Sequence, residues 1–495
     1  MRLLLLRPVA PNERFGLGPF FRIEPLGLEY VAAAVRRDGH EVAIHDLRFV
    51  PRQGRGSALH ALLAREQPDV VGVASAHTLD TDEAIDVARR VKAWRSGLFT
   101  LIGGHAAAVF PGPFQVDGVD AICCEDGERV VPELLGALAS GRPLARVAGL
   151  LAREHGAAGG GFVRGPCSEE RVSLDDVPLP ARDALRTGHR DYLCVQRRPV
   201  WLVETTRGCP YRCSFCTIWQ HVDRSFRCRG IASVVDDLAS VGGNVFLADD
   251  LFWHPAGYSE ELAAALRRSG VRKEWMLAQT RTDLVARHPG LLERWLPLAR
   301  QIDVFFGFEA PSDAGLASVQ KDADVAAIEE AIAVCRRLGI GVTGNFICDP
   351  DWEEADFERL WAFLEKHRLD HVGFTVLTPL PGTRYFDESR PRIRDPDWSH
   401  YDMHHLLWEP RLGRQRFFEL FAETWRRTAL HARGARGWWS YAKQVRARDL
   451  PFLFRVLRQS RRLFDPRAYL AETFPPGPTL PLPEHALARA AGSDG

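Results

Sequence analysis

The sequence has no excess of either charge and no long apolar run. Its 64 Lys and Arg residues balance its 64 Asp and Glu residues, so the formal net charge is zero over 495 residues. A neutral balance argues against a nucleic-acid-binding protein, in which an excess of basic residues is usual. No uncharged apolar stretch reaches about 18 residues, so no transmembrane helix is expected. The composition indicates a globular chain of about three domains.

Disulfide-rich architecture is also excluded, because the ten cysteines are scattered over a long chain. Free thiols are typical of a reducing cytosol, where thiolates are available for metal binding. We therefore expect a cytoplasmic protein. The opening segment Met1–Pro8 holds only four leucines between two arginines, and it is expected to be a buried strand rather than a signal peptide.

Residues 1–145 alternate apolar runs with amphipathic segments and predict a doubly wound, Rossmann-like α/β domain. The predicted strands are Arg2–Leu6, Glu41–His45, Val70–Ala74, Thr100–Ile102 and Ala121–Cys124. Predicted helices between them include Gly27–Asp38, Thr81–Trp94 and Arg129–Ala139. Such sheets bind ligands beyond the carboxyl ends of their strands, but a G-x-G-x-x-G motif is absent, so a dinucleotide is not expected.

The rest of the chain divides into three predicted parts. Residues 146–195 are rich in Gly, Arg and Pro and are expected to be a linker across the first two domains. Residues 196–386 resume the alternation and predict a partial (β/α)6 barrel, with functional residues at the carboxyl ends of its strands. Its predicted strands are Val200–Thr205, Asn244–Ala248, Trp275–Gln279, Val304–Phe308, Gly341–Ile347 and His371–Val376. Residues 387–495 are expected to be mostly helical.

The strongest chemical signal is a C-x3-C-x2-C motif directly after the first barrel strand, formed by Cys209, Cys213 and Cys216. Three thiolates on one loop can hold three irons of a [4Fe-4S] cluster, which usually takes four cysteines. The remaining iron would then be open to S-adenosylmethionine (SAM). The alternative is a zinc site completed by His221 or Cys228, although no second C-x-x-C pair is present.

This motif on a partial barrel resembles the radical SAM superfamily, and the resemblance spans residues 199 to about 386. It implies that Phe215 packs against adenine and that an acidic residue after the second strand, Asp249 or Asp250, binds the SAM amino group. Ala248-Asp249-Asp250 departs here from the commoner Gly-Gly-Glu. The resemblance further implies that Arg281 pairs with the SAM carboxylate, that Glu309 lies near the ribose and that Asn345 lies at a similar height.

The amino-terminal domain resembles a cobalamin-binding domain. The resemblance implies that small and polar residues at the strand ends contact the corrin. These are Thr78, Gly103, Gly104, His105, Glu125 and Gly127. The Asp-x-His-x-x-Gly motif for a lower histidine ligand is absent from residues 1–145, and His77 and His105 are possible neighbours of the corrin. The alternative is a degenerate Rossmann-like module with a docking role only.

The combination resembles the cobalamin-dependent (B12-binding) radical SAM enzymes, class B methyltransferases, and within them the hopanoid C-3 methylase-like branch. The segments that carry this resemblance are Arg22–Glu29, Gly103–Ala106, Asp349–Trp352 and Thr378–Thr383. The resemblance covers about residues 1–430. It implies that one SAM methylates cobalamin, while a second SAM yields the 5′-deoxyadenosyl radical that activates an unactivated carbon. The expected cofactors are therefore a [4Fe-4S] cluster, SAM and cobalamin.

Several alternatives for the function stay open on the sequence. A cobalamin-dependent radical SAM cyclase or ring-rearranging enzyme would use the same cofactors without methyl transfer. A non-catalytic regulator would bind cobalamin or a metal without turning over SAM. Natural products, polycyclic lipids and sugars are all possible substrates. The expected partners are a small-molecule substrate and an electron donor such as flavodoxin or ferredoxin. The basic, aromatic stretch 438–455 predicts a helical cap over the barrel or a peripheral membrane contact.

Overall fold

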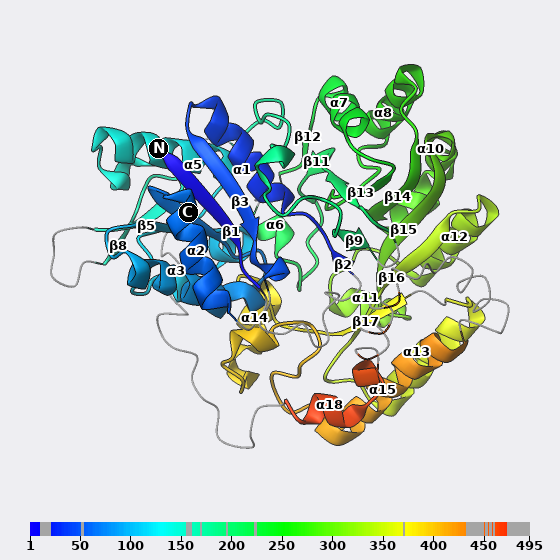
Figure 1. Ribbon diagram of the computed structural model, residues 1–495. Coiled ribbons are helices and arrows are strands. Elements are labelled where there is room, and N and C mark those ends of the chain that lie inside the picture. The colour runs from blue at the N-terminus through cyan, green and yellow to red at the C-terminus, as the bar shows by residue number, and fades with distance from the viewer. Residues whose placement is uncertain are drawn as a thin grey trace.

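The computed structural model describes residues 1–9, 21–50, 54–154, 161–168, 171–194, 197–221, 225–369, 372–431, 450, 454, 458 and 461–472. Two α/β domains lie side by side, and the carboxy-terminal elements lie below both of them in the view of Figure 1. The predicted fold class, with a doubly wound domain followed by a six-stranded partial barrel, is confirmed.

The amino-terminal domain is built on a seven-stranded sheet in the order β3-β1-β4-β5-β6-β7-β8. Its five parallel strands are β1 (Arg2–Arg7), β3 (Glu41–Asp46), β4 (Val70–Ala74), β5 (Phe99–Gly103) and β6 (Ala121–Cys123). Each consists largely of buried apolar residues, as expected for strands that are covered by helices on both faces. The order reverses beside β1, which creates the crevice at the carboxyl ends of the strands.

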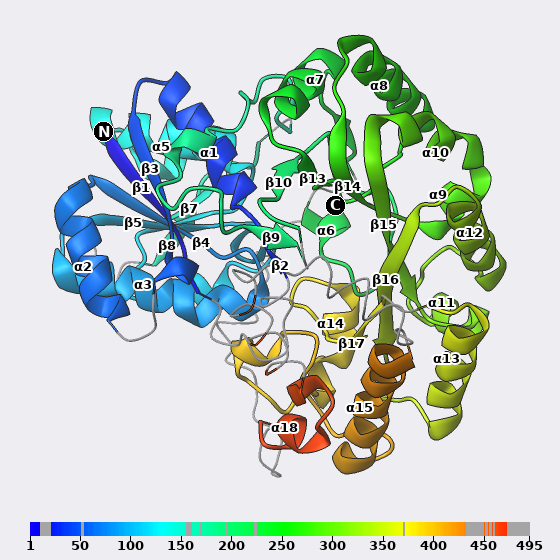
Figure 2. The same cartoon turned by 45° about the vertical axis from the view of Figure 1, so that its right-hand side comes forward.

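Helices cover both faces of this sheet, and two hydrophobic cores form, one on each side. The longer helices are α1 (Leu26–Arg37), α2 (Arg55–Glu66), α3 (Thr81–Trp94) and α5 (Gly127–Ser140), and α4 (His105–Val109) is a short turn of helix. α1 and α5 share one core, while α2 and α3 share the other (Figure 2).

The segment predicted as a linker, 146–195, partly belongs to the amino-terminal sheet. β7 (Leu150–Arg153) pairs antiparallel with β6, and β8 (Phe162–Arg164) pairs antiparallel with β7. Further along, β9 (Leu193–Cys194) pairs with β2 (Phe21–Arg22). The later part contacts both domains, because Asp183 pairs with Arg36 and Arg182 pairs with Asp237. The limits of the domains at 145, 195 and 386 stay predictions.

The second domain is a parallel six-stranded sheet in sequential order, which is the arrangement of a partial barrel. Its strands are β10 (Trp201–Val203), β13 (Asn244–Leu247), β14 (Lys273–Thr280), β15 (Ala299–Glu309), β16 (Gly341–Cys348) and β17 (Val372–Val376). The principal helices are α7 (Ile231–Ser240), α8 (Ala256–Ser269), α9 (Thr282–Arg287), α10 (Pro289–Trp295), α12 (Val325–Arg337) and α13 (Glu354–Lys366). α11 (Asp313–Ser318) is shorter, and β11 (Thr206–Arg207) pairs with β12 (Arg227–Cys228) outside the barrel.

The described carboxy-terminal elements are helices, namely α14 (Arg384–Ser389), α15 (Arg414–His431) and α18 (Pro466–Leu470). α15 packs on α13 and α18 and extends the barrel core with Phe417, Phe418 and Phe421. The aromatic, basic stretch 438–455 lies almost wholly outside the described residues. Within the described part of the chain, every helix is too short or too polar to cross a bilayer.

Candidate active site between the two domains

The cysteine loop follows β10 and β11 and turns sharply at Gly208. Gly208 has φ of +104°, a left-handed conformation that side chains rarely adopt. The loop then carries Cys209, Cys213 and Cys216 and ends at α6 (Ile218–His221). It stands at the carboxyl end of a barrel strand, which is where a (β/α) barrel places its functional residues.

Asp249 anchors the start of this loop. The Asp249 side chain accepts hydrogen bonds from the Thr205 backbone N–H at 2.7 Å, the Thr205 hydroxyl at 2.5 Å and the Thr206 hydroxyl at 2.8 Å. Asp249 is 2% exposed, and burial raises its pKa to about 7. With its oxygens committed to the loop, Asp249 holds β13 to the cluster segment, and its predicted contact with SAM becomes the less favoured of the two alternatives.

Replacing Asp249 with alanine should therefore destabilise the loop. Three buried donors would lose their acceptor, at a cost of about 3 kcal/mol or more. We expect a lower melting temperature and incomplete iron loading, measured by scanning calorimetry and iron analysis. Asp236→Ala, at an exposed position of α7, is the matched control. Wild-type melting and iron content in Asp249→Ala would contradict the anchoring role.

Asp250 is the carboxylate that remains available beside the cysteines. It accepts one hydrogen bond, from the Gly208 backbone N–H at 2.9 Å. Burial raises the pKa of Asp250 to about 6, and its charge in turn contributes to the raised pKa values of Cys209 and Cys216. An ammonium group next to Asp250 would stabilise its ionised form, which fits the predicted role toward the SAM amino group.

The three cysteines fit a cubane cluster better than a zinc ion. Sulfur ligands on one tetrahedral zinc lie about 3.8 Å apart. Among the described residues, a compact set with all ligand atoms within 4.8 Å occurs only elsewhere, so the three sulfurs are more widely spaced than that. Cys228, the alternative fourth zinc ligand, lies in β12, where its backbone pairs with that of Thr206 in β11. The side chain of His221 lies outside the described residues.

Burial raises the pKa of all three cysteines, that of Cys216 to about 12. Thiolates at such positions need a cation, which the irons of a cluster supply. The positive charges of Lys321 and Arg281 lower the pKa of Cys213, but burial raises it by more. The local environment therefore fits a thiolate-bound metal cluster.

Arg281 follows β14 and is 5% exposed. Its guanidinium lies 3.6 Å above the ring of Tyr211 and directs one nitrogen toward Cys213 Sγ at 3.9 Å. The other nitrogens donate to Asp283 at 2.7 Å and to the backbone oxygens of Lys321 and Asp322 at 2.5 and 2.8 Å. Arg281 thus braces the cysteine loop, and its predicted pairing with the SAM carboxylate stays a prediction.

Glu309, at the end of β15, forms a buried ion pair with Lys321 at 2.6 Å. Lys321 was not identified from the sequence, since it belongs to no motif and lies 12 residues after its partner. Glu309 adopts φ of +60°, after a register shift between Gly307 and Glu309, which turns the end of the strand. A carboxylate and an ammonium therefore stand together at the barrel mouth, where a polar contact to the ribose was predicted.

Asn345 and Phe215 are the last two residues that were predicted to contact SAM. Asn345 lies within β16 and donates to the Thr375 hydroxyl at 2.8 Å. Phe215 lies in the cysteine loop and is partly exposed, so an aromatic face is available there. The two assignments to SAM stay predictions.

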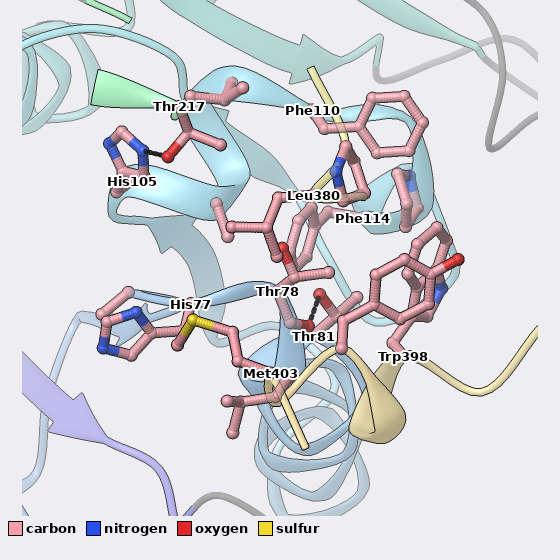
Figure 3. Close-up of a pocket in the computed structure, with 17 residues that line it drawn as sticks. His77, Thr78, Thr81, His105, Phe110, Phe114, Thr217, Leu380, Trp398 and Met403 are labelled. Atoms are coloured by element: carbon pink, nitrogen blue, oxygen red, sulfur yellow. Dashed lines mark hydrogen bonds between the residues drawn. The ribbon is translucent and has the colours of Figure 1, made fainter. Parts of the chain in front are cut away.

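A pocket opens at the carboxyl ends of β4 and β5, facing the cysteine loop (Figure 3). The pocket is open to solvent, and its empty space together with the adjoining solvent is about 590 Å³. Thr78 and His105 line it, and Thr217 from the cysteine loop completes one side. Their contacts with the corrin stay a prediction. The aromatic and aliphatic side of the pocket consists of Val109, Phe110, Phe114, Leu380, Trp398, Tyr401 and Met403.

Gly103 and Gly104 lie at the carboxyl end of β5, directly before the pocket residue His105. Gly104 has φ of +106°, and a Cβ on it would lie 2.6 Å from the Ser75 carbonyl oxygen. The hydroxyl of Ser75 is buried and has no hydrogen-bond partner among the described atoms. A close backbone turn with an unsatisfied hydroxyl fits a large ligand that carries amide groups, as cobalamin does.

Glu125 and Gly127 make packing contacts within the protein, and their predicted contacts with the corrin stay predictions. Glu125 accepts from Arg129 at 2.6 Å and from the Ser168 backbone N–H at 3.1 Å, so it holds the connector against α5. A Cβ at Gly127 would lie 2.9 Å from Val31, so this glycine lets α5 approach α1. Neither residue lines the described pocket. The sequence pattern located the strand end but could not reveal these tertiary contacts.

His105 Nε2 and Thr217 Oγ1 lie 2.6 Å apart and join the amino-terminal domain to the residue directly after Cys216 (Figure 3). A third segment closes the same junction. The Tyr385 N–H donates to the Ser214 carbonyl at 3.1 Å, and a Cβ at Gly382 would lie 2.1 Å from Val109. The cysteine loop is therefore held from both sides at the pocket.

Replacing Thr217 with valine tests this junction with an isosteric side chain. Loss of one hydrogen bond between the domains is worth about 1 kcal/mol, so we expect product formation to slow about fivefold. Cluster absorbance and cobalamin content should stay at wild-type values. An unchanged rate would show that this hydrogen bond does not set the spacing between the domains.

A second junction is built around Arg207, two residues before Cys209. Arg207 pairs with Glu128 at 2.8 Å, with Asp126 at 3.4 Å and with Glu204 at 2.9 Å. Arg227 adds a contact to Asp126 at 2.9 Å. The turn at residues 125–128, predicted to face the corrin, thus directs Asp126 and Glu128 toward the cysteine loop. These two residues form a contact surface between the domains.

Comparison with known proteins agrees with this arrangement. The B12 binding domain family matches residues 20–135, and the Radical SAM superfamily matches residues 203–364. TsrM from Kitasatospora setae, a radical S-adenosylmethionine methyltransferase solved with cobalamin and a [4Fe-4S] cluster, superposes with a TM-score of 0.62 at 19% identity over 79% of this chain and 78% of that chain. OxsB, a cobalamin-dependent S-adenosylmethionine radical enzyme, superposes with a TM-score of 0.66 at 15% identity over 95% of this chain and 74% of that chain.

The two domains and the cysteine loop between them define a cobalamin-dependent radical SAM enzyme, with a [4Fe-4S] cluster, SAM and cobalamin as cofactors. Hopanoid C-3 methylase from Methylococcus capsulatus is 31% identical over 84% of this chain and 78% of that protein. Anaerobic magnesium-protoporphyrin IX monomethyl ester cyclase from Rubrivivax gelatinosus is 25% identical over 68% of this chain and 61% of that protein. The chain belongs to the family of cobalamin-dependent radical SAM methyltransferases that includes hopanoid C-3 methylase.

Proposed function

We propose that this methyltransferase acts on an unactivated carbon of a largely apolar small molecule, such as a polycyclic lipid. When bound, SAM and the cluster supply a carbon-centred radical, and cobalamin supplies the methyl group. The observation that carries the proposal is the His105–Thr217 contact of 2.6 Å, which sets the pocket of the amino-terminal domain against the cysteine loop.

The aromatic and aliphatic side of the pocket supports an apolar substrate that lies beside cobalamin. Phe110, Phe114, Leu380 and Trp398 offer apolar surface next to the polar strand ends that carry Thr78 and His105. Apolar side chains can exclude water from a reactive intermediate and position a substrate without hydrogen bonds. The 31% identity to hopanoid C-3 methylase is a second reason to begin with a hopanoid as the test substrate.

We also propose roles for the residues around the cysteines. Asp250 is placed to receive the SAM amino group, while Phe215, Glu309 and Asn345 face the nucleoside and Arg281 braces Cys213. An external one-electron donor, such as flavodoxin or ferredoxin, would reduce the cluster. The proposed site of action is the cytoplasm.

The test is anaerobic reconstitution with iron, sulfide and hydroxocobalamin, followed by incubation with SAM, reductant and a hopanoid. We expect 5′-deoxyadenosine and a product heavier by one CH2, detected by mass spectrometry. A product that has only lost hydrogen would support cyclisation. Protein that never yields 5′-deoxyadenosine with any substrate would support a binding protein instead.

A further inference from the structure

Three ligand-type side chains converge away from the cysteine loop, where the amino-terminal domain, the connector and β10 meet. Glu24 precedes α1, Glu29 lies in its first turn and His189 belongs to the connector. His189 Nε2 lies 2.8 Å from Glu24 Oε2 and 3.7 Å from Glu29 Oε1. One ligand atom from each residue lies within 4.8 Å of the other two.

Both carboxylates are buried, with side chains that are 0% exposed. Glu24 Oε1 accepts a hydrogen bond from the Leu202 backbone N–H at 2.5 Å, which ties the group to the barrel. Neither oxygen of Glu29 accepts a hydrogen bond in the described structure, and Glu24 Oε2 also has no donor of good geometry. A buried carboxylate without a well-aligned donor is costly, so a cation held between Glu24, Glu29 and His189 would stabilise Glu29.

The surrounding charges leave a deficit of positive charge. Arg182 lies 3.7 Å from Glu24, but its guanidinium is already paired with Asp237 at 2.5 Å. The two carboxylates of Glu24 and Glu29 then face a single imidazole. The first turn of α1 favours an ionised Glu29, because the amino end of a helix stabilises negative charge.

We propose that Glu24, Glu29 and His189 bind one divalent cation of the zinc class, which pins the amino-terminal domain to the connector and the barrel. An imidazole with carboxylates suits zinc, whereas calcium and magnesium prefer oxygen ligands alone. Ligand atoms on a tetrahedral zinc lie about 3.3 to 3.5 Å apart. The separations of 2.8 and 3.7 Å bracket that range, so small side-chain movements complete the site.

The alternative to a bound metal ion is protonation of His189 and Glu29. Although burial opposes a charged imidazole, the neighbouring carboxylates of Glu24 and Glu29 raise the pKa of His189 to about 9. Burial raises the pKa of Glu29 to about 7. Without a metal, His189 would therefore be protonated and Glu29 partly protonated at neutral pH, and Glu29→Gln would be harmless or stabilising.

The test uses the reconstituted holoenzyme, exposed to Zn²⁺, desalted and analysed for zinc and iron. We expect about one zinc per chain with an unchanged iron content, and a melting temperature that Zn²⁺ raises by about 3 °C or more. In Glu29→Gln, bound zinc should fall at least tenfold and the thermal shift should disappear. Glu41→Gln, at an exposed carboxylate paired with Arg2, should behave like wild type.

His189→Asn provides a second variant, expected to lose zinc in the same way. Cluster absorbance and cobalamin content verify that each variant is folded. The proposal is overturned if the wild-type enzyme retains no zinc, or if Glu29→Gln retains as much zinc as wild type. These readouts do not depend on methyl transfer, so they separate this proposal from the proposed function.

Discussion

Cys213→Ala is expected to lose cluster absorbance and all 5′-deoxyadenosine formation, while it keeps bound cobalamin. Cys213 is 8% exposed and is the cysteine closest to the cationic side chains, Arg281 and Lys321. Without its thiolate the loop offers only two ligands, too few to hold a cubane that already lacks a fourth protein ligand. The expected loss of activity is complete, at least about a thousandfold, because nothing else in the site can cleave SAM.

The informative result is that Cys213→Ala should lose the cluster and still bind cobalamin. Most residues that line the pocket, including Thr78 and His105, belong to the amino-terminal domain, so cobalamin should still bind when the cluster is absent. Ultraviolet–visible spectra of the reconstituted protein give both quantities in one measurement. Cys335→Ala, at a buried cysteine of α12 distant in sequence, is the matched control and should retain cluster and activity. Loss of cobalamin together with the cluster would contradict the assignment of the two cofactors to two domains.

Arg207→Met is expected to separate SAM cleavage from methyl transfer. The positive charge of Arg207 balances the carboxylates of Glu128, Asp126 and Glu204 at the interface between the domains. Its side chain is 17% exposed. Removing one partner of such a group costs about 3 to 5 kcal/mol, because the acidic side chains are left uncompensated. Since that energy holds the domains together, methylated product should fall by about a hundredfold or more.

The measurement is the ratio of 5′-deoxyadenosine to methylated product in the same reaction. We expect this ratio to rise in Arg207→Met, because the loop still carries its three cysteines while the pocket is displaced. Arg207→Lys should recover part of the coupling, since one ammonium can compensate only part of the acidic group. Arg90→Met removes a surface ion pair with Asp86 and should match wild type. A product ratio equal to that of wild type would show that the ion-paired junction does not position the cofactors.

Periodicity in the sequence was enough to predict the architecture. α3 and α7 have the bounds expected from their amphipathic patterns, and all six barrel strands occur in the predicted order. The alternation of apolar runs succeeds because buried parallel strands and their covering helices are encoded locally. β7 and β8 were not predicted, since a Gly-rich stretch separates them and the pairing of β7 with β6 is a long-range contact.

The candidate site was predictable to the extent that chemistry is encoded in short motifs. The spacing of Cys209, Cys213 and Cys216 and the strand-end positions of Asp250 and His105 could be recognised in this way. Tertiary pairing could not, because nothing near Glu309 in the sequence indicates Lys321, and nothing near Arg207 indicates Asp126 and Glu128. In the same way, the sequence did not indicate the packing contacts that Glu125 and Gly127 make.

The central claim is that three thiolates hold a cluster whose fourth iron is left for SAM. Mössbauer spectroscopy of the ⁵⁷Fe-reconstituted enzyme, recorded before and after addition of SAM, tests it most directly. We predict that the signal of one iron in four changes on addition of SAM, while the other three stay as they were. A spectrum that SAM leaves unchanged, or a purified protein that carries zinc at Cys209, Cys213 and Cys216, would contradict the account.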